Sequence, residues 1–342
     1  MRRRLLIVGL VVAAAIAACW LILRRDPIPY ETLEARYGSE ASKFLTLENG
    51  LIVHMTDEGP PDGPVVILLH GFASSLATWD AWADGLADEY RVLRFDLPGH
   101  GLTRVLADTD LSTEGLVTFV DDVADELGLQ QFTLAGSSMG GHTAWRFALA
   151  HPEKLDALIL VAAAGLPEAD AGEEPPVVFQ MIENPFVRPI IKDLDVSPLI
   201  RDGLMSSFVD PEFVTNQMVR EYADLARAPG HRAALIALAT RDRTDAAAFE
   251  ARLSEISVPV LVLHGREDKI VPPGFANRYG EQIPNSEVIF YDQIGHLPQE
   301  EAAAQSLADA EAFLVSALLS DETQVPETAI DDVNMAETEP LD

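Results

Sequence analysis

The stretch GSSMGG at 136–141 places two serines among glycines, directly after an apolar run. Ser138 has glycine both two residues before it and two residues after it, at Gly136 and Gly140, whereas Ser137 lacks this pair. Between a strand and a helix, G-x-S-x-G forms a turn so tight that side chains at the flanking positions would collide. The serine is left projecting beside a helix N-terminus, whose dipole favours developing negative charge. Ser138 is therefore predicted to be a nucleophile.

A serine nucleophile needs a general base, and the sequence offers eight histidines. His296 stands just after the last predicted strand and before the last predicted helix, and an open α/β sheet places its sites at strand carboxyl ends. His296 is therefore the predicted base, and His264, inside an apolar run, is interpreted as structural. The histidines to which we assign no chemical role are His54, His100, His142, His151 and His231.

The base needs a carboxylate that holds its tautomer and stabilises its charged form. The segment HGREDKIVPP follows the predicted strand at 258–265 and carries two neighbouring acids, Glu267 and Asp268. Asp268 is the predicted acid, and Glu267 is its rival.

Acyl chemistry also needs two N–H donors for the oxyanion. One is predicted to be the backbone N–H of Met139, which directly follows the nucleophile. The other should come from the loop after the apolar strand at 64–71, where Phe72 is the candidate and His70-Gly71 would hold the shape of the loop.

The elements that must position these residues alternate between strands and helices. Apolar runs predict strands at 64–71, 90–101, 131–136, 156–165, 258–265 and 286–296, and helical spacing predicts helices at 112–129, 140–152 and 298–319. A hairpin is predicted at 43–56 around Asn49-Gly50, a type I′ turn signal. This alternation predicts an α/β fold, with a mostly parallel, doubly wound sheet covered on both faces.

Residues 166–256 interrupt the alternation with scattered prolines and then helical patterns, which predict a helical insertion that could serve as a lid. The tail at 321–342 is acidic, lacks Lys and Arg, and is predicted to be disordered. The predicted divisions are 1–25, 26–42 (linker), 43–165 (first part of the core), 166–256 (lid), 257–320 (second part of the core) and 321–342.

The chain opens with an uncharged run of 19 residues, 5–23, between arginines. Such a run just spans a hydrocarbon core of about 30 Å. The larger positive side precedes it, so we expect a membrane anchor at 1–25 with the rest of the chain outside the cytoplasm. A cleaved signal of a secreted protein and a lipoprotein signal at Cys19 are the alternatives.

Lys and Arg number 24 against 55 Asp and Glu, a formal charge of −31. This balance argues against nucleic acid as a partner, because its phosphates would be repelled. The single cysteine, Cys19, excludes an intramolecular disulfide and a paired-cysteine metal site.

From about 43 to 319 the chain resembles the α/β-hydrolase superfamily, in its group with a single helical lid. The resemblance is carried by HGFASSLATW, FDLPGHGLT, GSSMGG, HGREDKIVPP and IGHLPQ, in this order; Thr103 departs from the serine often found after PGHG. It implies Ser138 as nucleophile, Asp268 rather than Glu267 as acid and His296 as base. A serine at this position speaks against haloalkane dehalogenases and epoxide hydrolases, which use aspartate.

The resemblance implies a serine esterase without metal or cofactor, acting on apolar acyl esters such as monoacylglycerol-like lipids. The alternatives with the same triad are a carbon–carbon bond hydrolase and a cofactor-free haloperoxidase. A ligand-binding protein without catalysis is the alternative from another class.

Overall fold

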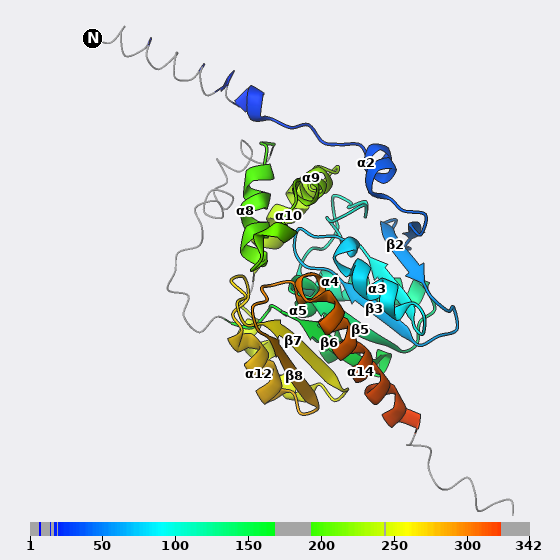
Figure 1. The fold of residues 1–342 in the computed structure, drawn as a ribbon. Helices are drawn as coiled ribbons and strands as arrows, with labels where there is room; N and C mark the ends of the chain where they lie inside the picture. Colours follow the sequence, from blue (N-terminus) through cyan, green and yellow to red (C-terminus); the bar gives the residue numbers. More distant parts are fainter. Residues whose placement is uncertain are drawn as a thin grey trace, which may run out of the picture.

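The computed structural model describes residues 20–167, 193–242 and 244–322, and four isolated residues before them, at 7, 14, 17 and 18. Within this part of the chain, eight strands form one sheet in the order β1-β2-β4-β3-β5-β6-β7-β8 (Figure 1). The pairs β1–β2 and β2–β4 are antiparallel, and all other neighbours are parallel. The predicted mostly parallel α/β sheet is confirmed.

The strands fall at the apolar runs of the sequence, but β4, β6 and β8 end four to six residues before the predicted ends. They are β1 (Lys43–Thr46), β2 (Ile52–Glu58), β3 (Val65–Leu69), β4 (Arg91–Phe95), β5 (Phe132–Ser137), β6 (Leu155–Val161), β7 (Val260–Gly265) and β8 (Ser286–Tyr291). Every residue of β5 and β7 is buried, as expected of strands covered on both faces.

The hairpin of β1 and β2 is confirmed, but its turn differs from the predicted type I′. Gly50 has φ +85°, whereas Asn49 is not among the residues with positive φ. A type I′ turn needs positive φ at both central residues, so this hairpin closes by another turn. Asn49 instead stabilises the turn through its side chain, which accepts a hydrogen bond from the Leu51 amide at 2.9 Å.

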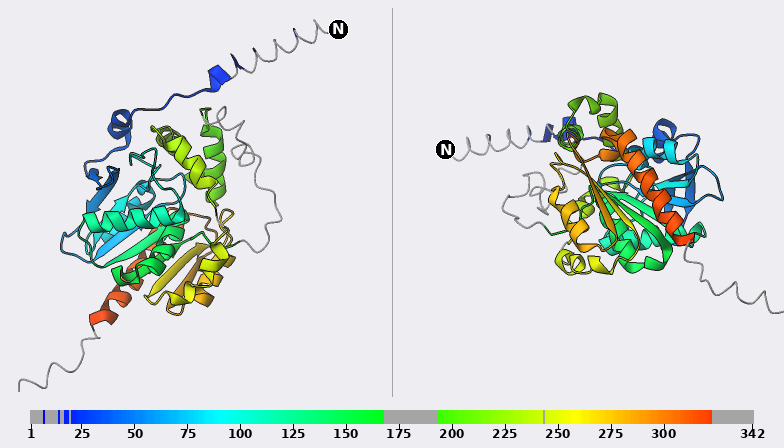
Figure 2. Two further views of the ribbon diagram at one scale, coloured as in Figure 1. Left: turned by 180° about the vertical axis from the view of Figure 1, so that it is seen from behind. Right: turned by 60° about the horizontal axis from the view of Figure 1, so that its bottom comes forward.

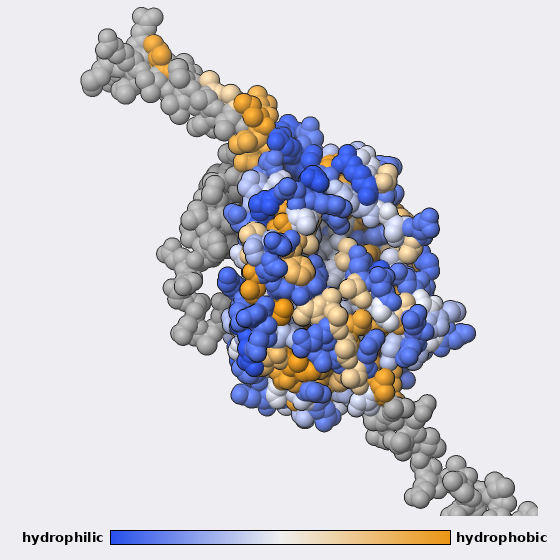
Figure 3. Space-filling view, viewed as in Figure 1, coloured by the Kyte–Doolittle hydropathy of each residue, from blue (hydrophilic) through white to orange (hydrophobic). Residues whose placement is uncertain are grey.

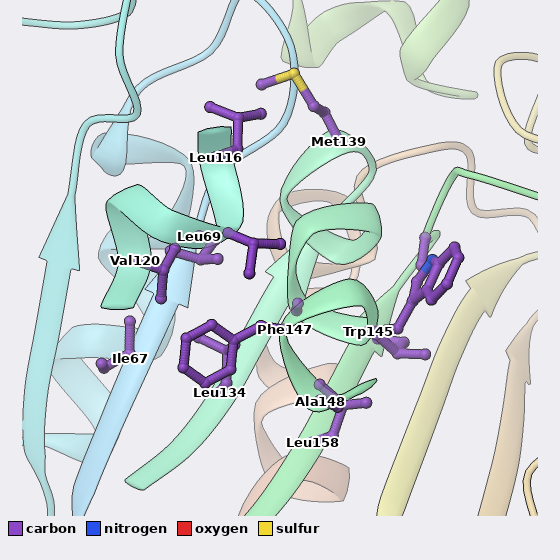
Figure 4. Close-up of a cluster of buried hydrophobic side chains, with 14 of the residues drawn as sticks. Ile67, Leu69, Leu116, Val120, Leu134, Met139, Trp145, Phe147, Ala148 and Leu158 are labelled. Atoms are coloured by element: carbon purple, nitrogen blue, oxygen red, sulfur yellow. The ribbon is translucent and has the colours of Figure 1, made fainter. Parts of the chain in front are cut away.

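Helices cover both faces of the sheet (Figures 1 and 2). The apolar residues of α4 (Thr113–Glu126), α5 (Met139–Ala150) and α12 (Gly274–Gln282) pack on one face. Those of α3 (Asp80–Leu86) and α14 (Ala303–Glu322) pack on the other. Between strands and α4 and α5 lies a dense core (Figure 4), in which Phe147 and Trp145 are fully buried.

The last predicted helix is interrupted. Residues 298–319 were expected to form one helix, but α13 (Pro298–Glu301) ends at Ala302, whose φ −122° and ψ 39° are not helical, and α14 starts at the next residue. The short α13 carries the residues that directly follow His296.

Helices also fill the described part of the insertion between β6 and β7: α8 (Ser197–Ser207), α9 (Asn216–Leu225), α10 (His231–Ala239) and the short α11 (Ala246–Glu250). The first three lie together at one end of the sheet (Figure 1). Their role as a lid, and the predicted domain boundaries, stay predictions. The prolines at 175–189 and most of the acidic tail fall outside the described residues.

The chain before the core runs along the insertion. Leu23 and Arg25 exchange backbone hydrogen bonds with residues 193–195, and α2 (Tyr30–Tyr37) contacts α9 through the ion pair of Arg36 with Asp224, at 2.9 Å. Figure 3 shows apolar residues on the described part of the projecting start, where Leu21 and Ile22 are exposed.

The structure contradicts the predicted membrane anchor at 1–25 and the localisation outside the cytoplasm that was inferred from it. Among the residues that it describes, no helix is long and apolar enough to cross a membrane. The described helical residues here are 7, 14, 17, 18 and 20–23, after which Arg24 forms an isolated bridge with Leu194; most of 1–19 lies outside the described residues.

Candidate active site

Ser138 occupies the tight turn between β5 and α5. Its φ of 53° and ψ of −112° lie in a region that L-residues rarely adopt, and its side chain is partly exposed while its neighbours are buried. A non-glycine residue persists in such a conformation only where the surrounding structure fixes it. The strained serine projecting from a strand end is the feature that the G-x-S-x-G pattern predicts.

The glycines of the pattern are required by close backbone approaches. A Cβ on Gly136 would lie 2.3 Å from the carbonyl oxygen of Gly140, and a Cβ on Gly140 would lie 2.4 Å from that of Leu69. Neither neighbour can yield, because both are backbone atoms of the central elements β3 and α5. The helix N-terminus can thus approach the strand ends only where both side chains are absent.

Backbone hydrogen bonds hold the turn in place. The Ser138 amide donates to Val161 at 2.9 Å, and the Ser138 carbonyl accepts from Ala164 at 3.0 Å. The Ala164 carbonyl in turn accepts from the Trp145 indole at 3.1 Å and from the Tyr279 hydroxyl at 2.8 Å. The end of β6 and the residues that follow it therefore hold Ser138 in its strained conformation.

The two predicted oxyanion donors flank this serine. Met139 is the first residue of α5, so its N–H has no acceptor within the helix, while its side chain lies in the core (Figure 4). The loop after β3 passes beside the nucleophile, since a Cβ on Gly71 would lie 3.2 Å from the Cβ of Ser138. Phe72 follows Gly71 directly, and its side chain is half-exposed. Their role as donors stays a prediction.

His70 holds the shape of that loop. Its Nδ1 lies 2.7 Å from the Gly71 carbonyl, and its Nε2 lies 2.9 Å from the Leu97 amide. The amide can only donate, so Nε2 accepts and Nδ1 carries the proton. Burial lowers the pKa of His70, in keeping with a neutral ring.

Asp268 and His296 are in direct contact. His296 Nδ1 lies 2.8 Å from Oδ2 of Asp268, and both side chains are buried. Oδ1 of Asp268 accepts the backbone N–H groups of Ile270 and Val271 at 2.8 and 3.0 Å. The rival Glu267 is exposed to solvent, so the prediction of Asp268 as the partner of His296 agrees with the geometry.

Asp268 is held as an anion. Burial by itself would raise its pKa, but hydrogen bonds from His264 and His296 keep that pKa well below its usual range. With Oδ1 occupied by backbone donors and Oδ2 by imidazoles, the carboxylate fixes Nδ1 of His296 as the protonated nitrogen. Nε2 of His296 is then the nitrogen left to act as an acceptor.

His264 is part of this cluster, which the sequence analysis missed. Its Nε2 lies 3.0 Å from Oδ2 of Asp268 and 3.1 Å from the Val271 carbonyl, whereas its Nδ1 is buried without a hydrogen-bond partner among the described residues. The spacing of four residues to Asp268 was visible in the sequence, but it signals a contact only in a helix, and the chain here is a strand end and loop.

A contact also joins the segment after His296 to the serine turn. Gln299 of α13 donates to Oγ of Ser137 at 3.3 Å, one residue before the nucleophile. The loops that carry the predicted base and the predicted nucleophile are therefore packed against each other at the same end of the sheet.

A second buried carboxylate, Asp96, lies near the loop that follows β3, with its Oδ1 4.0 Å from Nε2 of His70. Its Oδ2 is 2.7 Å from Nδ1 of His54, and its Oδ1 accepts the Leu76 amide at 2.8 Å. Burial opposes the charge, but the hydrogen bond and charge of His54 lower the pKa of Asp96 to about 2. His54, given no partner from the sequence, thus has a structural one.

Comparison with known proteins agrees with this architecture. The sequence model of the α/β hydrolase fold matches residues 64–303, which is most of the chain. The protein belongs to the α/β hydrolase fold family. The match lies within the region, 43–319, over which the motifs predicted the resemblance.

The relatives that it resembles are mostly hydrolases. It is 31% identical over 268 residues to a dihydrolipoyllysine-residue acetyltransferase component of an acetoin cleaving system from Pseudomonas putida, covering 78% of this chain and 67% of that one. It is 28% identical to a 2-hydroxy-6-oxononadienedioate/2-hydroxy-6-oxononatrienedioate hydrolase from Cupriavidus pinatubonensis (77% and 91% covered). It is also 28% identical to a pimeloyl-[acyl-carrier protein] methyl ester esterase from Nitrosomonas europaea (72% and 93%).

Solved structures share the fold. A membrane phospholipase A, described as a bacterial virulence factor, superimposes with a TM-score of 0.70 at 23% identity, with 93% of this chain and 99% of that chain covered. A meta-cleavage product hydrolase from Pseudomonas fluorescens gives a TM-score of 0.68 at 23% identity (80% and 98% covered). At these identities the likeness shows the fold alone.

Proposed function

We propose that this protein is a serine hydrolase that cleaves carboxylic esters through an acyl intermediate on Ser138. The observation that carries the proposal is the 2.8 Å contact of His296 Nδ1 with the buried Asp268 carboxylate, at the strand ends where Ser138 sits in its strained turn. A fixed imidazole tautomer at the same end of the sheet as a partly exposed, strained serine is what nucleophilic acyl transfer needs.

In the proposed first half-reaction, Oγ of Ser138 attacks the acyl carbon and gives its proton to Nε2 of His296. Asp268 stabilises the imidazolium that forms, and it stays an anion throughout. The backbone N–H groups of Met139 and Phe72 donate hydrogen bonds to the negatively charged oxygen of the tetrahedral intermediate. As the intermediate collapses, the ester C–O bond breaks and His296 returns the proton to the leaving alcohol.

In the second half-reaction, water takes the place of the alcohol. His296 removes a proton from the water as its oxygen attacks the acyl carbon of the intermediate, and a second oxyanion forms. Collapse breaks the bond to Oγ, Ser138 regains a proton from His296, and the acid is released. One water is consumed for each ester, and the chain ends in its starting state.

The substrate class proposed is apolar acyl esters, including monoacylglycerol-like lipids. The esterase among the relatives supports ester chemistry. The apolar residues of the insertion give weaker support for an apolar substrate than their number suggests. Phe208 is buried in the core of the insertion, and Met205 and Phe213 are exposed. Three further apolar residues of the insertion that could line a pocket, Phe179, Met181 and Phe186, fall outside the described residues.

Carbon–carbon bond hydrolysis is the second candidate. It is supported by several relatives at 27–29% identity that are named as hydrolases of 2-hydroxy-6-oxo dienoates. The two reactions can share a triad, so only the substrate separates them.

The test is labelling of the full-length protein by a fluorophosphonate, with the adduct mapped by mass spectrometry. Turnover of p-nitrophenyl esters of rising chain length, and of 2-hydroxy-6-oxo-6-phenylhexa-2,4-dienoate, is measured beside it. We expect an adduct on Ser138 and ester turnover with an optimum chain length. Faster turnover of the dienoate would move the assignment to carbon–carbon hydrolysis, and a folded protein without label on Ser138 would exclude both.

The chain offers a matched control in the neighbouring serine. Ser138→Ala should lose label and turnover. Ser137→Ala should keep both, because Ser137 is buried and, within the described part of the chain, its side chain takes part in a single hydrogen bond, the 3.3 Å bond from Gln299. Loss of activity in both variants would point to damage of the turn rather than removal of a nucleophile.

A further inference from the structure

Glu301, the last residue of α13, joins two segments that lie far apart in the sequence. Its Oε2 accepts the Gly295 amide at 2.6 Å. Its Oε1 accepts the amides of Val209 and Asp210 at 2.7 and 2.8 Å. One carboxylate therefore binds the residue directly before His296 and the chain directly after α8.

The same two segments touch each other through their backbones. The His296 amide donates to the Ser207 carbonyl at 2.7 Å, and a Cβ on Gly295 would lie 2.4 Å from that oxygen. Leu297 is buried in the apolar cluster of the insertion, beside Leu204 and Phe208. The residues before and after His296 therefore both contact the C-terminal end of α8.

The carboxylate is suited to this connection because all three partners are donors. Glutamate offers two acceptor oxygens and no hydrogen, so each oxygen can be filled by backbone N–H groups. Glutamine at this position would present an NH₂ group to one side of the connection. A donor would then face a donor, either at Gly295 or at Val209 and Asp210.

We propose that Glu301 is a positioning residue for the reaction, which holds the loop of His296 in register with the segment after α8. It does not touch the substrate; it acts through the backbone on which the imidazole is mounted. This inference rests on the proposed function, in which His296 is the base. It also gives the insertion a specific part in catalysis, because the segment 207–210 belongs to it.

The test compares Glu301→Gln with a matched exposed substitution, Glu255→Gln, in the full-length protein. Glu255 is exposed, and its ion pair within the described part of the chain is with Arg252, in its own turn. For each protein we measure the rate constant and the final extent of fluorophosphonate labelling at Ser138. We also measure kcat and KM for p-nitrophenyl butyrate, and the Tm.

We expect Glu301→Gln to lower the labelling rate constant and kcat about tenfold or more, because catalysis is sensitive to small displacements of the base. KM should change less than about threefold, since the mutated group does not bind the acyl chain, and labelling should still reach completion. Glu255→Gln should match the wild type. A mere loss of folded protein would lower the extent of labelling and leave its rate constant unchanged.

An unchanged labelling rate in Glu301→Gln overturns the proposal, whether or not KM or the extent of labelling changes. If the wild type itself takes no label at Ser138, both the proposed function and this inference are refuted. If the wild type is labelled and Glu301→Gln is labelled at the same rate, only the proposed role of Glu301 is refuted. Should Glu301→Gln not fold, Glu301→Asp, with its shorter arm, is judged by the same two criteria.

Discussion

Replacing Asp268 by asparagine tests the proposed triad at its acid. Oδ1 of Asp268 is held by the amides of Ile270 and Val271, and Oδ2 faces His296 and His264. Asparagine has one oxygen, and the two backbone donors fix it at the Oδ1 position. Its NH₂ group must then face the imidazoles, where an acceptor was needed.

The consequence is a change of tautomer at His296. With a donor opposite it, Nδ1 must become the acceptor, so the ring proton moves to Nε2. Nε2 is the nitrogen that has to take the proton of Ser138, and in this form it has no lone pair to do so. The side chain keeps its place in the structure while it loses its function as a base.

The expected loss in kcat/KM is about a thousand- to ten-thousandfold, which corresponds to about 4–5.5 kcal/mol of barrier. Residual turnover would come from the oxyanion donors and substrate binding. Stability should fall as well, because the folded state holds the pKa of Asp268 below its unfolded value. That contribution is present above the unfolded pKa and is lost as the pH falls, so wild type and variant should converge in acid.

The assay is ester turnover from pH 5 to 9, with urea unfolding of the same proteins from pH 7 down to about pH 2, beside the control Asp292→Asn. Asp292 lies in the loop before His296, but it is exposed, and its ion pair within the described part of the chain is with Arg266. The control should keep its activity. A folded Asp268→Asn protein with kcat/KM within tenfold of the wild type would refute the tautomer argument and with it the role of Asp268.

Two further predictions concern the framework around the site. Gly136→Ala should destabilise the fold by about 3 kcal/mol or leave the protein insoluble, because the added Cβ would lie 2.3 Å from the backbone of Gly140. The control Gly203→Ala, on α8 with open space around it, should leave the free energy of unfolding in urea unchanged or raise it by up to about 1 kcal/mol. Asp96→Asn should lower the free energy of unfolding by about 2 kcal/mol at pH 7, because folding lowers the pKa of Asp96 to about 2. In urea unfolding, the difference from the wild type should shrink between pH 4 and pH 2, and a difference that grows in acid would contradict this prediction.

Local patterns predicted the serine turn well because one of its two main constraints is local. The collision that requires Gly136 arises between the end of β5 and the helix that follows it, whereas the collision that requires Gly140 is with Leu69 of β3, far away in the sequence. The parallel strands were predictable for a similar reason, since burial on both faces leaves a continuous apolar run. The turn type at Gly50 was not, because Asn49-Gly50 is compatible with several hairpin turns.

Contacts between distant segments could not be predicted in this way. The partners of Glu301 are backbone amides 91 and 92 residues away, and a backbone amide has no residue type to recognise. His54 and Asp96 are 42 residues apart on antiparallel neighbours, and nothing in either local sequence marks the other. The predicted anchor failed differently: among the described residues, no helix is long and apolar enough to cross a membrane.

Sheet topology explains why the site was nevertheless easier to predict than the substrate. Strands β5, β6, β7 and β8 are neighbours, each about 4.8 Å from the next, so the loops that follow β5, β7 and β8 meet above a few strand widths of sheet. β6 pairs directly with β7 from Leu158↔Val260 onward, although the whole insertion lies between them. The insertion therefore does not set the register of the strands that carry the loops of Ser138, Asp268 and His296. It does contact the loop of His296, through Ser207 and through the Glu301 carboxylate, so the proposed chemistry depends on both the strand register and this connection. The substrate remains harder to predict, because the rest of the insertion is constrained by neither.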